Sequence, residues 1–268
     1  MHTAHADHPI GAKALIAGLE KRAETSDRKP ILIHTSGTAV LIDPEEPKGS
    51  YQSDKIYSDG DLSAYHAFPP TRFHKDVDDI VFEAGRRGKI DAVVIAPPTI
   101  WGIGQGEFNT HSIQVPMLIK GCLKYGRGLV LEDGLNIWSI IHVADLSQAY
   151  LTILDAALHG KLPSDPNGRY FFVENGEYEQ RQVAEVVTKT LYERGKVEAP
   201  EPTRVPIGDA EKYTDETGKR SLMPGTGGNS RSRAVLVRRL GWEAKRGSNK
   251  EFLKSIRDDV EHILKSVG

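Results

Sequence analysis

The stretch IDAVVIAPPTIWGIGQG, residues 90–106, is the most informative part of the sequence for the fold. Its first six residues form a largely β-branched apolar run, which is too short for a helix and is typical of a strand buried on both faces. Pro97 and Pro98 follow, and because proline has no backbone N–H and a fixed φ, the pair ends the strand and stiffens the next segment. In an open α/β sheet, ligands bind beyond the carboxyl ends of the strands. We therefore expect residues 96–101 to lie beside a ligand.

Short apolar runs and helical periods alternate along the rest of the chain. Besides the run at 90–95, strands are predicted at residues 30–34, 138–143 and 170–173. Apolar residues repeat at helical spacing, and so predict helices, at about residues 10–19, 77–84, 115–122, 144–157, 183–191 and 256–264. Strand and helix in alternation predict an α/β fold, with helices on the faces of a parallel sheet.

The bulk composition excludes several classes of protein. The 268 residues suffice for one large domain, or for one domain with a smaller lobe. Lys plus Arg total 35 and Asp plus Glu total 37, so this near-neutral chain is not expected to bind nucleic acid. No apolar stretch has the length of a membrane span, and the N-terminus has no signal-peptide pattern, so we expect no membrane partner. The single cysteine, Cys122, suits a reducing compartment, and a cytoplasmic location is expected.

Two more stretches complete a family pattern with residues 90–106. They are GLNIWSIIHVADLSQAYLTIL, residues 134–154, and NSRSRAVLVRRLGW, residues 229–242. Together the three resemble the extended short-chain dehydrogenases/reductases, also called the NAD-dependent epimerase/dehydratase family, and are nearest to atypical members common in fungi. The resemblance implies an incomplete Rossmann-like parallel sheet with a smaller C-terminal substrate lobe. The implied bounds are residues 1–105 and 138–178 for the sheet domain, and residues 106–137 and 179–268 for the lobe.

The resemblance also implies NAD or NADP as the cofactor. In the family, the segment that follows this strand lies against the nicotinamide, and the first residues here, HTAHA, resemble the segment after the family's third strand. The implied cofactor contacts are Thr3, Ala4, Pro97, Pro98, Thr99 and Ile100.

The family opens with a strand, a Gly-x-x-Gly-x-x-Gly turn and a helix, which together bind the pyrophosphate. The chain has no such opening, so about 70 to 80 residues of the usual doubly wound half are expected to be missing. Gly102-Ile-Gly104-Gln-Gly106 has a different spacing and no helix is expected directly behind it, so it is interpreted as a loop. We therefore expect weak or absent dinucleotide binding, unless a partner chain supplies the pyrophosphate site.

The segment HTSGTAVL, residues 34–41, fits the strand end that carries the family's catalytic hydroxyl. Thr35, Ser36 and Thr38 are the hydroxyls that could take this part. The segment follows a predicted strand directly, so it should share the carboxyl edge of the sheet with residues 96–101.

The family's proton donor is the tyrosine of a Tyr-x-x-x-Lys pair on the next helix, whose lysine lowers the tyrosine pKa. The matching region, residues 69–85, places either Pro70 and His74 or Thr71 and Lys75 at these two positions. Neither register supplies a tyrosine. A histidine at this point could act as acid or base near neutral pH. The alternative is that His74 and Lys75 belong to the solvated first turn of a helix.

Other polar residues are given structural roles. Asp145 suits the first turn of the helix after a predicted strand, where the helix dipole favours a carboxylate. His142 either faces the substrate or is a satisfied structural histidine. His2, His5 and His8 lie three residues apart, but the segment fits the family's loop after a strand, and no metal site is expected.

Two kinds of function remain open. The first is an NAD(P)-dependent oxidoreductase or epimerase for a small carbonyl or hydroxyl substrate, with Thr35, Ser36, His74 and Lys75 as candidate catalytic residues. The alternative is a non-enzymatic relative that senses dinucleotides or acts as a scaffold, or a truncated gene product. If the central strand is missing, the strand at 31–34 has an open edge, which a homodimer could cover.

Overall fold

The computed structural model describes residues 1–108, 110–214 and 227–267. The main sheet has three parallel strands in the order β1 (Ile31–Thr35), β3 (Asp91–Ala96) and β7 (Tyr170–Phe172). On the other side of β1, the described residues contribute one parallel bridge, between His2 and His34. The predicted α/β fold with a parallel sheet is confirmed.

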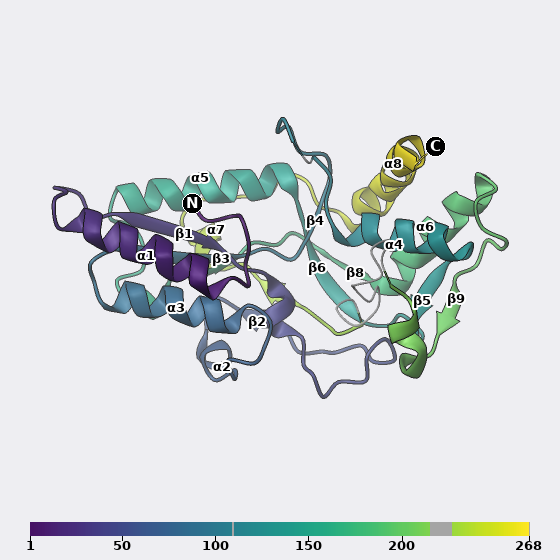
Figure 1. Cartoon of the computed structure of the whole chain (residues 1–268), viewed down its shortest axis with the longest axis horizontal. Coiled ribbons are helices and arrows are strands. Elements are labelled where there is room, and N and C mark those ends of the chain that lie inside the picture. Colours follow the sequence, from purple (N-terminus) through teal and green to yellow (C-terminus); the bar gives the residue numbers. More distant parts are fainter. Residues whose placement is uncertain (109, 215–226, 268) are drawn as a thin grey trace.

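Helices cover both faces of this sheet (Figure 1). Helix α5 (Val143–Leu158) lies on one face, and α1 (Pro9–Ala23) and α3 (Lys75–Arg86) pack together on the other. Every residue of β3 after Asp91 is buried, as expected of a strand between two helical layers. The start of α1 is fixed by Pro9 and by the His8 ring, whose Nδ1 accepts a hydrogen bond from Gly11 N at 2.8 Å.

Shorter elements form the rest of the molecule. Strand β6 (Ile137–His142) pairs in parallel with β4 (Thr99–Trp101) and antiparallel with β8 (Glu177–Glu179). The two-stranded pairs are β5 (Leu129–Leu131) with β9 (Thr203–Val205) and β2 (Tyr57–Ser58) with β10 (Ser232–Arg233). Helices α4 (Gln114–Tyr125), α6 (Gln180–Glu193) and α8 (Asn249–Val267) pack on one another. The short helices are η1 (Thr38–Leu41), α2 (Ser63–His66), η2 (Pro166–Gly168), η3 (Ile207–Lys212) and α7 (Leu236–Arg239).

All of the strands and helices predicted from apolar periodicity are confirmed. The strands that periodicity did not predict, such as β4 and β10, are two or three residues long. Buried apolar side chains form two clusters, one around the main sheet and one among α4, α6 and α8. Val237 and Trp242, near the C-terminus, pack in the first cluster. The division into domains by residue range stays a prediction.

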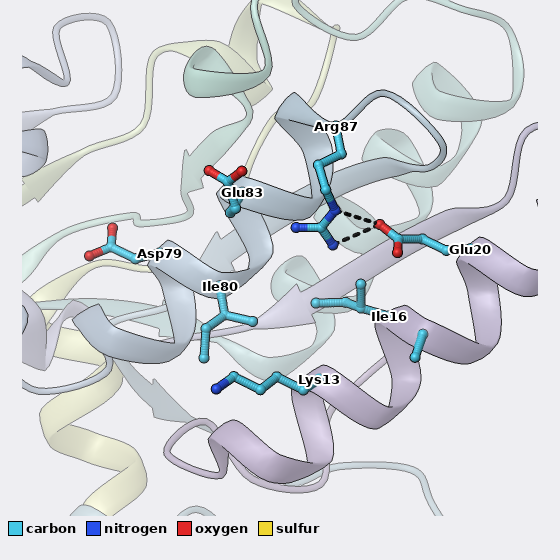
Figure 2. A pocket seen from close by; sticks show the side chains of 8 residues that line it. Lys13, Ile16, Glu20, Asp79, Ile80, Glu83 and Arg87 are labelled. Atoms are coloured by element: carbon cyan, nitrogen blue, oxygen red, sulfur yellow. Dashed lines mark hydrogen bonds and ion pairs between the residues drawn. The ribbon is translucent and has the colours of Figure 1, made fainter.

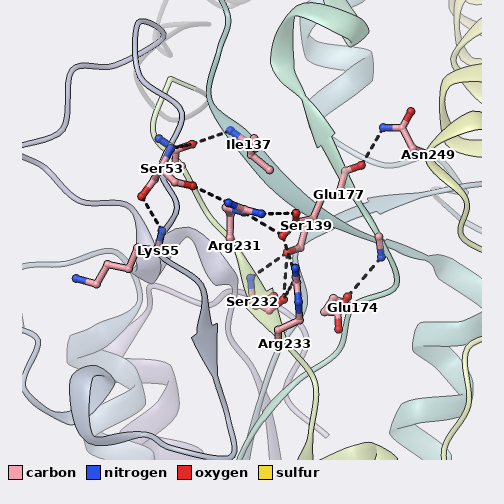
Figure 3. A network of polar contacts seen from close by, with 12 residues as sticks. Ser53, Lys55, Ile137, Ser139, Glu174, Glu177, Arg231, Ser232, Arg233 and Asn249 are labelled. Carbon is pink, nitrogen blue, oxygen red and sulfur yellow. Dashed lines mark hydrogen bonds and ion pairs between the residues drawn. The ribbon is translucent and has the colours of Figure 1, made fainter.

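The segment at 230–233 is held against β6 and β8 by polar contacts (Figure 3). Glu177 accepts hydrogen bonds from Arg231 Nε at 3.1 Å and Nη2 at 2.8 Å, and from Arg233 Nη1 at 2.8 Å. The Ser232 N–H donates to Ser139 Oγ at 2.9 Å. Burial raises the pKa of Glu177, but the two arginines outweigh it and hold that pKa below its ordinary value. The third stretch of the family pattern therefore has a structural role.

None of the helices in the described part of the chain is both long enough and apolar enough to cross a membrane.

Candidate functional site

A pocket of about 490 Å³ lies at the carboxyl ends of β1 and β3. Two backbone hydrogen bonds fasten its walls, from Ser36 N to Ile95 O at 2.8 Å and from Thr38 N to Pro97 O at 3.1 Å. This is the edge at which the sequence predicted a ligand. The predicted site residues that line the pocket are Thr35, Ser36, His74, Pro97, Pro98 and Ile100.

Four predicted site residues lie elsewhere. Lys75 is buried, with its ammonium paired to Asp79 in the next turn of α3. Thr99 is fully buried in β4, and its hydroxyl lies 3.2 Å from Tyr178 OH. Thr3 and Ala4 are exposed and do not line the pocket.

The imidazole of His74 is held between a carboxylate and the pocket. His74 precedes α3 in the left-handed backbone region, with φ of 65°. Its Nδ1 lies 2.6 Å from Asp7 Oδ1, and its Nε2 lies 3.0 Å from the point where a Cβ on Gly37 would sit. The carboxylate of Asp7 accepts the Nδ1 proton, so Nε2 is the ring atom presented beside Gly37, which lines the pocket.

The hydroxyl of Ser36 is bonded to a carboxyl group beneath the pocket. Ser36 Oγ donates to Asp78 Oδ2 at 2.8 Å, and Tyr65 OH donates to the same oxygen at 2.9 Å. Burial raises the pKa of Asp78 to about 7, against the opposing effect of these two hydrogen bonds. The pocket floor therefore rests on a carboxyl group that can hold a proton near neutral pH.

Two histidines extend this buried cluster towards the N-terminus. His34 Nε2 lies 3.7 Å from Asp78 Oδ1, and His34 Nδ1 lies 2.8 Å from His2 Nδ1. Burial, and after it the neighbouring His2, lowers the pKa of His34 to about 4. His34 is therefore neutral at physiological pH, and one of the two rings donates the hydrogen that joins them.

A second predicted hydroxyl, that of Thr35, is also engaged. Thr35 Oγ1 lies 2.6 Å from the hydroxyl of Tyr150 on α5. Burial raises the pKa of Tyr150, more than the bond to Thr35 lowers it, so its phenol keeps its proton. Tyr150 thus fixes the direction of the Thr35 hydroxyl at the pocket.

His142 has the structural role that was one of its two interpretations. Its Nδ1 accepts a hydrogen bond from Ala144 N at 3.1 Å and so caps α5, and its ring packs edge-on against Trp101. Gly102 has φ of +87°, and a Cβ there would lie 2.4 Å from His142 Nε2. The loop after β4 therefore needs glycine at this point for contact with the histidine, and the next helix in the described residues, α4, begins at Gln114.

A second pocket, of about 460 Å³, lies between α1 and α3 (Figure 2). Arg87 closes one side, because its Nε and Nη2 donate to Glu20 Oε1 at 2.9 and 2.7 Å. Lys13, Ile16 and Ile80 also line it. It contains none of the predicted site residues.

Sequence reasoning missed three residues that complete the first pocket. The sequence placed Asp7 in a loop and Asp78 in the solvated first turn of a helix. It placed Tyr150 on the apolar face of another helix. No local signal pairs His74 with Asp78, because His74 precedes α3 in the left-handed backbone region and does not share a helix face with Asp78. Their contacts with Gly37 and Ser36 depend on tertiary structure.

The described residues fit one part of NAD or NADP. Pro97 and Pro98 form a stiff wall without N–H groups, against which a flat ring could pack. A pyrophosphate needs a row of backbone N–H groups at the N-terminus of a helix. Within residues 1–108, 110–214 and 227–267, no strand leads through a tight glycine-rich turn into a helix longer than four residues. These ranges therefore offer a wall for the nicotinamide end and no cradle for the pyrophosphate.

Comparison with curated proteins gives one informative relative. The chain is 25% identical over 234 residues to the oxidase ucsJ of an Acremonium species. The alignment covers 82% of this chain and 64% of that protein, so the chain spans less than two thirds of its relative's length. No protein-family model matches the chain.

Comparison with solved structures gives many matches of similar quality. UDP-glucose 4-epimerase from Thermotoga maritima with UDP-glucose has a TM-score of 0.59 at 15% identity, over 100% of this chain and 76% of that chain. dTDP-glucose 4,6-dehydratase from Bacillus anthracis in complex with NAD has a TM-score of 0.55 at 16% identity, over 94% and 67%. Together with the parallel sheet and the pocket at its carboxyl edge, these matches show that the chain has the fold of the NAD-dependent epimerase/dehydratase enzymes, as its sequence resemblance predicted.

Proposed function

We propose that the chain is an NAD(P)-dependent oxidoreductase- or epimerase-like protein that binds a small carbonyl or hydroxyl compound in the pocket at the ends of β1 and β3. The observation that carries this proposal is the pair of His74 and Asp7 beside that pocket. The oxidase among the relatives, and the NAD-bound dehydratase among the structures, support the same class of chemistry.

His74 is the group that exchanges a proton with the ligand in this proposal. Asp7 keeps Nδ1 protonated, so Nε2 accepts a proton from a hydroxyl, and the protonated ring returns one to a carbonyl oxygen. Thr35, whose hydroxyl is held by Tyr150, and Ser36 also line the pocket and orient the ligand there. NAD or NADP, when bound, would supply or accept the hydride, with Pro97 and Pro98 beside its nicotinamide.

A second function, a scaffold or dinucleotide sensor without turnover, is favoured by other contacts. The hydroxyls of Thr35 and Ser36 already have protein partners, and the ammonium of Lys75 is paired with Asp79. A site of this kind lacks the free lysine that the family uses for catalysis, and of its three candidate hydroxyls Thr38 Oγ1 alone has no hydrogen-bond partner among the described residues.

Calorimetric titration with NAD, NADH, NADP and NADPH tests the proposal. We expect weak, saturable heat with at least one of the four. Gly37→Leu should abolish it, because Gly37 has an extended backbone that any residue can adopt, and the added side chain projects into the pocket beside His74. Gly208→Leu is the matched control, since no atom lies within 4 Å of a Cβ at that exposed position. Absence of heat from folded wild-type protein with all four nucleotides would refute the dinucleotide part.

His74→Gln separates the two functions. If the chain is an enzyme, this variant should bind the nucleotide as the wild type does and lose at least about 100-fold in turnover, the usual contribution of a positioned acid or base. Equal behaviour of the variant and wild type in both measurements would favour the sensor.

We also propose that two copies of the chain associate along the outer edge of β1. In the described residues that edge is paired only at His34, through His2, and an unpaired strand edge favours association. A concentration-independent monomer in sedimentation equilibrium would contradict this.

A further inference from the structure

The carboxyl group of Asp78 lies directly beneath the pocket and has no contact with solvent, with an exposed fraction of 0%. Its Oδ2 is bonded to Ser36 Oγ at 2.8 Å, and Ser36 lines the pocket. Any ligand that reaches the Ser36 hydroxyl is therefore one hydrogen bond away from Asp78. A change in the protonation of Asp78 has to be transmitted through that hydroxyl.

The surroundings of Asp78 give its negative charge little compensation. On its own helix, the charge of Lys75 is matched by its partner Asp79. From β1, His34 is neutral, and behind it lies His2. From α2 and β7 come the phenols of Tyr65 and Tyr170, and Tyr65 OH donates to Oδ2 at 2.9 Å. Hydrogen bonds to one oxygen are thus the principal stabilisation of the anion, and both forms of the carboxyl group are accessible near neutral pH.

The position of the carboxyl proton follows from the distances. Oδ1 has no hydrogen-bond partner, and His34 Nε2 lies 3.7 Å from it, beyond hydrogen-bond distance. A proton on Oδ1 would therefore have no hydrogen-bond acceptor in place among the described residues. A proton on Oδ2 would have two hydroxyl oxygens within reach, Ser36 Oγ at 2.8 Å and Tyr65 OH at 2.9 Å, and Ser36 Oγ is the nearer acceptor.

We propose that Asp78 is a positioning residue that sets the direction of the Ser36 hydrogen bond, so that a carbonyl ligand can pair with Ser36 only when Asp78 is protonated, whereas a hydroxyl ligand can pair with it in both states and is favoured when Asp78 is ionised. This inference rests on the proposed function of the pocket. An ionised carboxyl only accepts, so Ser36 must donate to it and has only lone pairs for the ligand. A protonated carboxyl donates to Ser36 Oγ, and the serine hydrogen is then available for a carbonyl oxygen.

Infrared spectroscopy of the ligand-free chain tests whether Asp78 carries a proton near neutral pH and shares it with Ser36. We expect an absorption band of a protonated carboxyl that disappears as the pH rises through neutrality, and that is absent in Asp78→Asn. Ser36→Ala should shift its frequency, because the carboxyl then loses its acceptor. Burial also raises the pKa of Asp59, to about 6, so Asp59→Asn identifies the band that belongs to that residue. If Asp78 contributes no band, or if Ser36→Ala leaves its band unmoved, the inference is overturned.

Saturation-transfer NMR with cyclohexanone and cyclohexanol tests whether the ligand preference follows the protonation of Asp78. The two probes have the same ring size and differ only in the oxygen group. Between about pH 5.5 and about pH 8.5 the ratio of their affinities should change three- to tenfold towards the alcohol, which is about the effect of one hydrogen bond. Ser36→Ala keeps His74 intact and should remove the change. If the pH dependence survives in Ser36→Ala, it comes from another group, and the inference is overturned.

The two proposals fail in different ways. If both probes bind in the pocket with a ratio that does not depend on pH, the inference about Asp78 is wrong and the proposed function stands. If neither probe binds wild-type protein at either pH, and Gly37→Leu changes nothing, the proposed function of the pocket is wrong, and with it the ligand preference assigned to Ser36. The infrared band decides separately whether Asp78 carries the proton.

Discussion

Replacing Asp145 tests whether the start of α5 needs a negative charge or a hydrogen-bond acceptor. Asp145 is 2% exposed, and its Oδ2 accepts hydrogen bonds from Lys245 N at 3.0 Å and from Arg246 N at 2.7 Å. From sequence, the residue was expected to act through the helix dipole. The structure adds a bridge between α5 and the segment that precedes α8.

The two roles predict different costs for two substitutions. In Asp145→Ala both backbone N–H groups lose an acceptor, and since a bond to a charged acceptor contributes about 1.5–3 kcal/mol, the loss is about 3–6 kcal/mol. Water can reach the exposed residues Lys245 and Arg246, so we expect the lower end, about 3 kcal/mol. In Asp145→Asn the amide oxygen can replace Oδ2 and accept both bonds. Only the charge is then lost, at a cost of about 1 kcal/mol.

Urea unfolding at neutral pH, followed by tryptophan fluorescence, measures both costs. Trp242 is a local reporter, since its Nε1 donates to Asp145 O at 3.0 Å. Asp155→Ala, at an exposed position on the same helix, is the control and should change the free energy of unfolding by less than about 0.5 kcal/mol. Equal costs for Asp145→Ala and Asp145→Asn would refute the argument, because they would mean that the charge alone matters.

Three further outcomes are expected, each measured as the free energy of unfolding in urea. Gly18→Ala should stabilise the chain by about 0.5–1 kcal/mol, because the glycine lies inside α1 with no atom within 4 Å of an added Cβ; a destabilisation would contradict this. Glu177→Ala should cost at least about 2 kcal/mol, since Arg231 and Arg233 both lose their acceptor. The control Glu185→Ala removes only an exposed ion pair with Arg181 and should cost less than about 1 kcal/mol. Finally, the pKa of Asp78 is about 7 in the folded chain and 3.8 as the ordinary value, so between these the folded chain holds a proton that the unfolded chain has lost. The contribution of Asp78 to stability should therefore fall as pH rises from about 4 to about 7. The pKa of His34 is lowered to about 4, so its contribution to stability rises with pH between about 4 and its ordinary pKa of 6.5. The contribution of Asp78 is therefore obtained from the difference between the free energies of unfolding of wild type and Asp78→Asn.

The architecture was predictable wherever a local pattern decides the structure. Residues 91–96 form a strand because a short β-branched run between two helical layers is buried on both faces. Strands β2 and β10 escaped prediction for the opposite reason. They pair Tyr57 with Ser232, far apart in the chain, and two residues are too few to show a period of two.

The candidate site was predictable in its location and not in its contacts. The rule that ligands bind at the carboxyl edge correctly brought Ser36 and Pro97 to one pocket. It could not supply the partner of Ser36, because Asp78 lies in the helix turn that was expected to be solvated, and it becomes buried only when α3 packs on the main sheet. For the same reason Lys75, a candidate from its spacing, lies buried against Asp79.

The family's catalytic pair lies four residues apart, and His74 and Asp78 have the same spacing. They lie four residues after Pro70 and His74, the first of the two alignments considered for that pair. His74 and Asp78 are four residues apart at the start of α3, and they reach two consecutive residues, Gly37 and Ser36. In the family a lysine in the second position lowers the pKa of its neighbour through its positive charge. A carboxyl group there has the opposite sign and cannot act in that way. In the proposed function its effect on a ligand passes through the Ser36 hydroxyl, while His74, which has Asp7 as a separate partner, exchanges the proton. If this division of roles is correct, Asp78→Asn should alter which ligand binds, and Asp7→Asn should alter turnover with little effect on that preference.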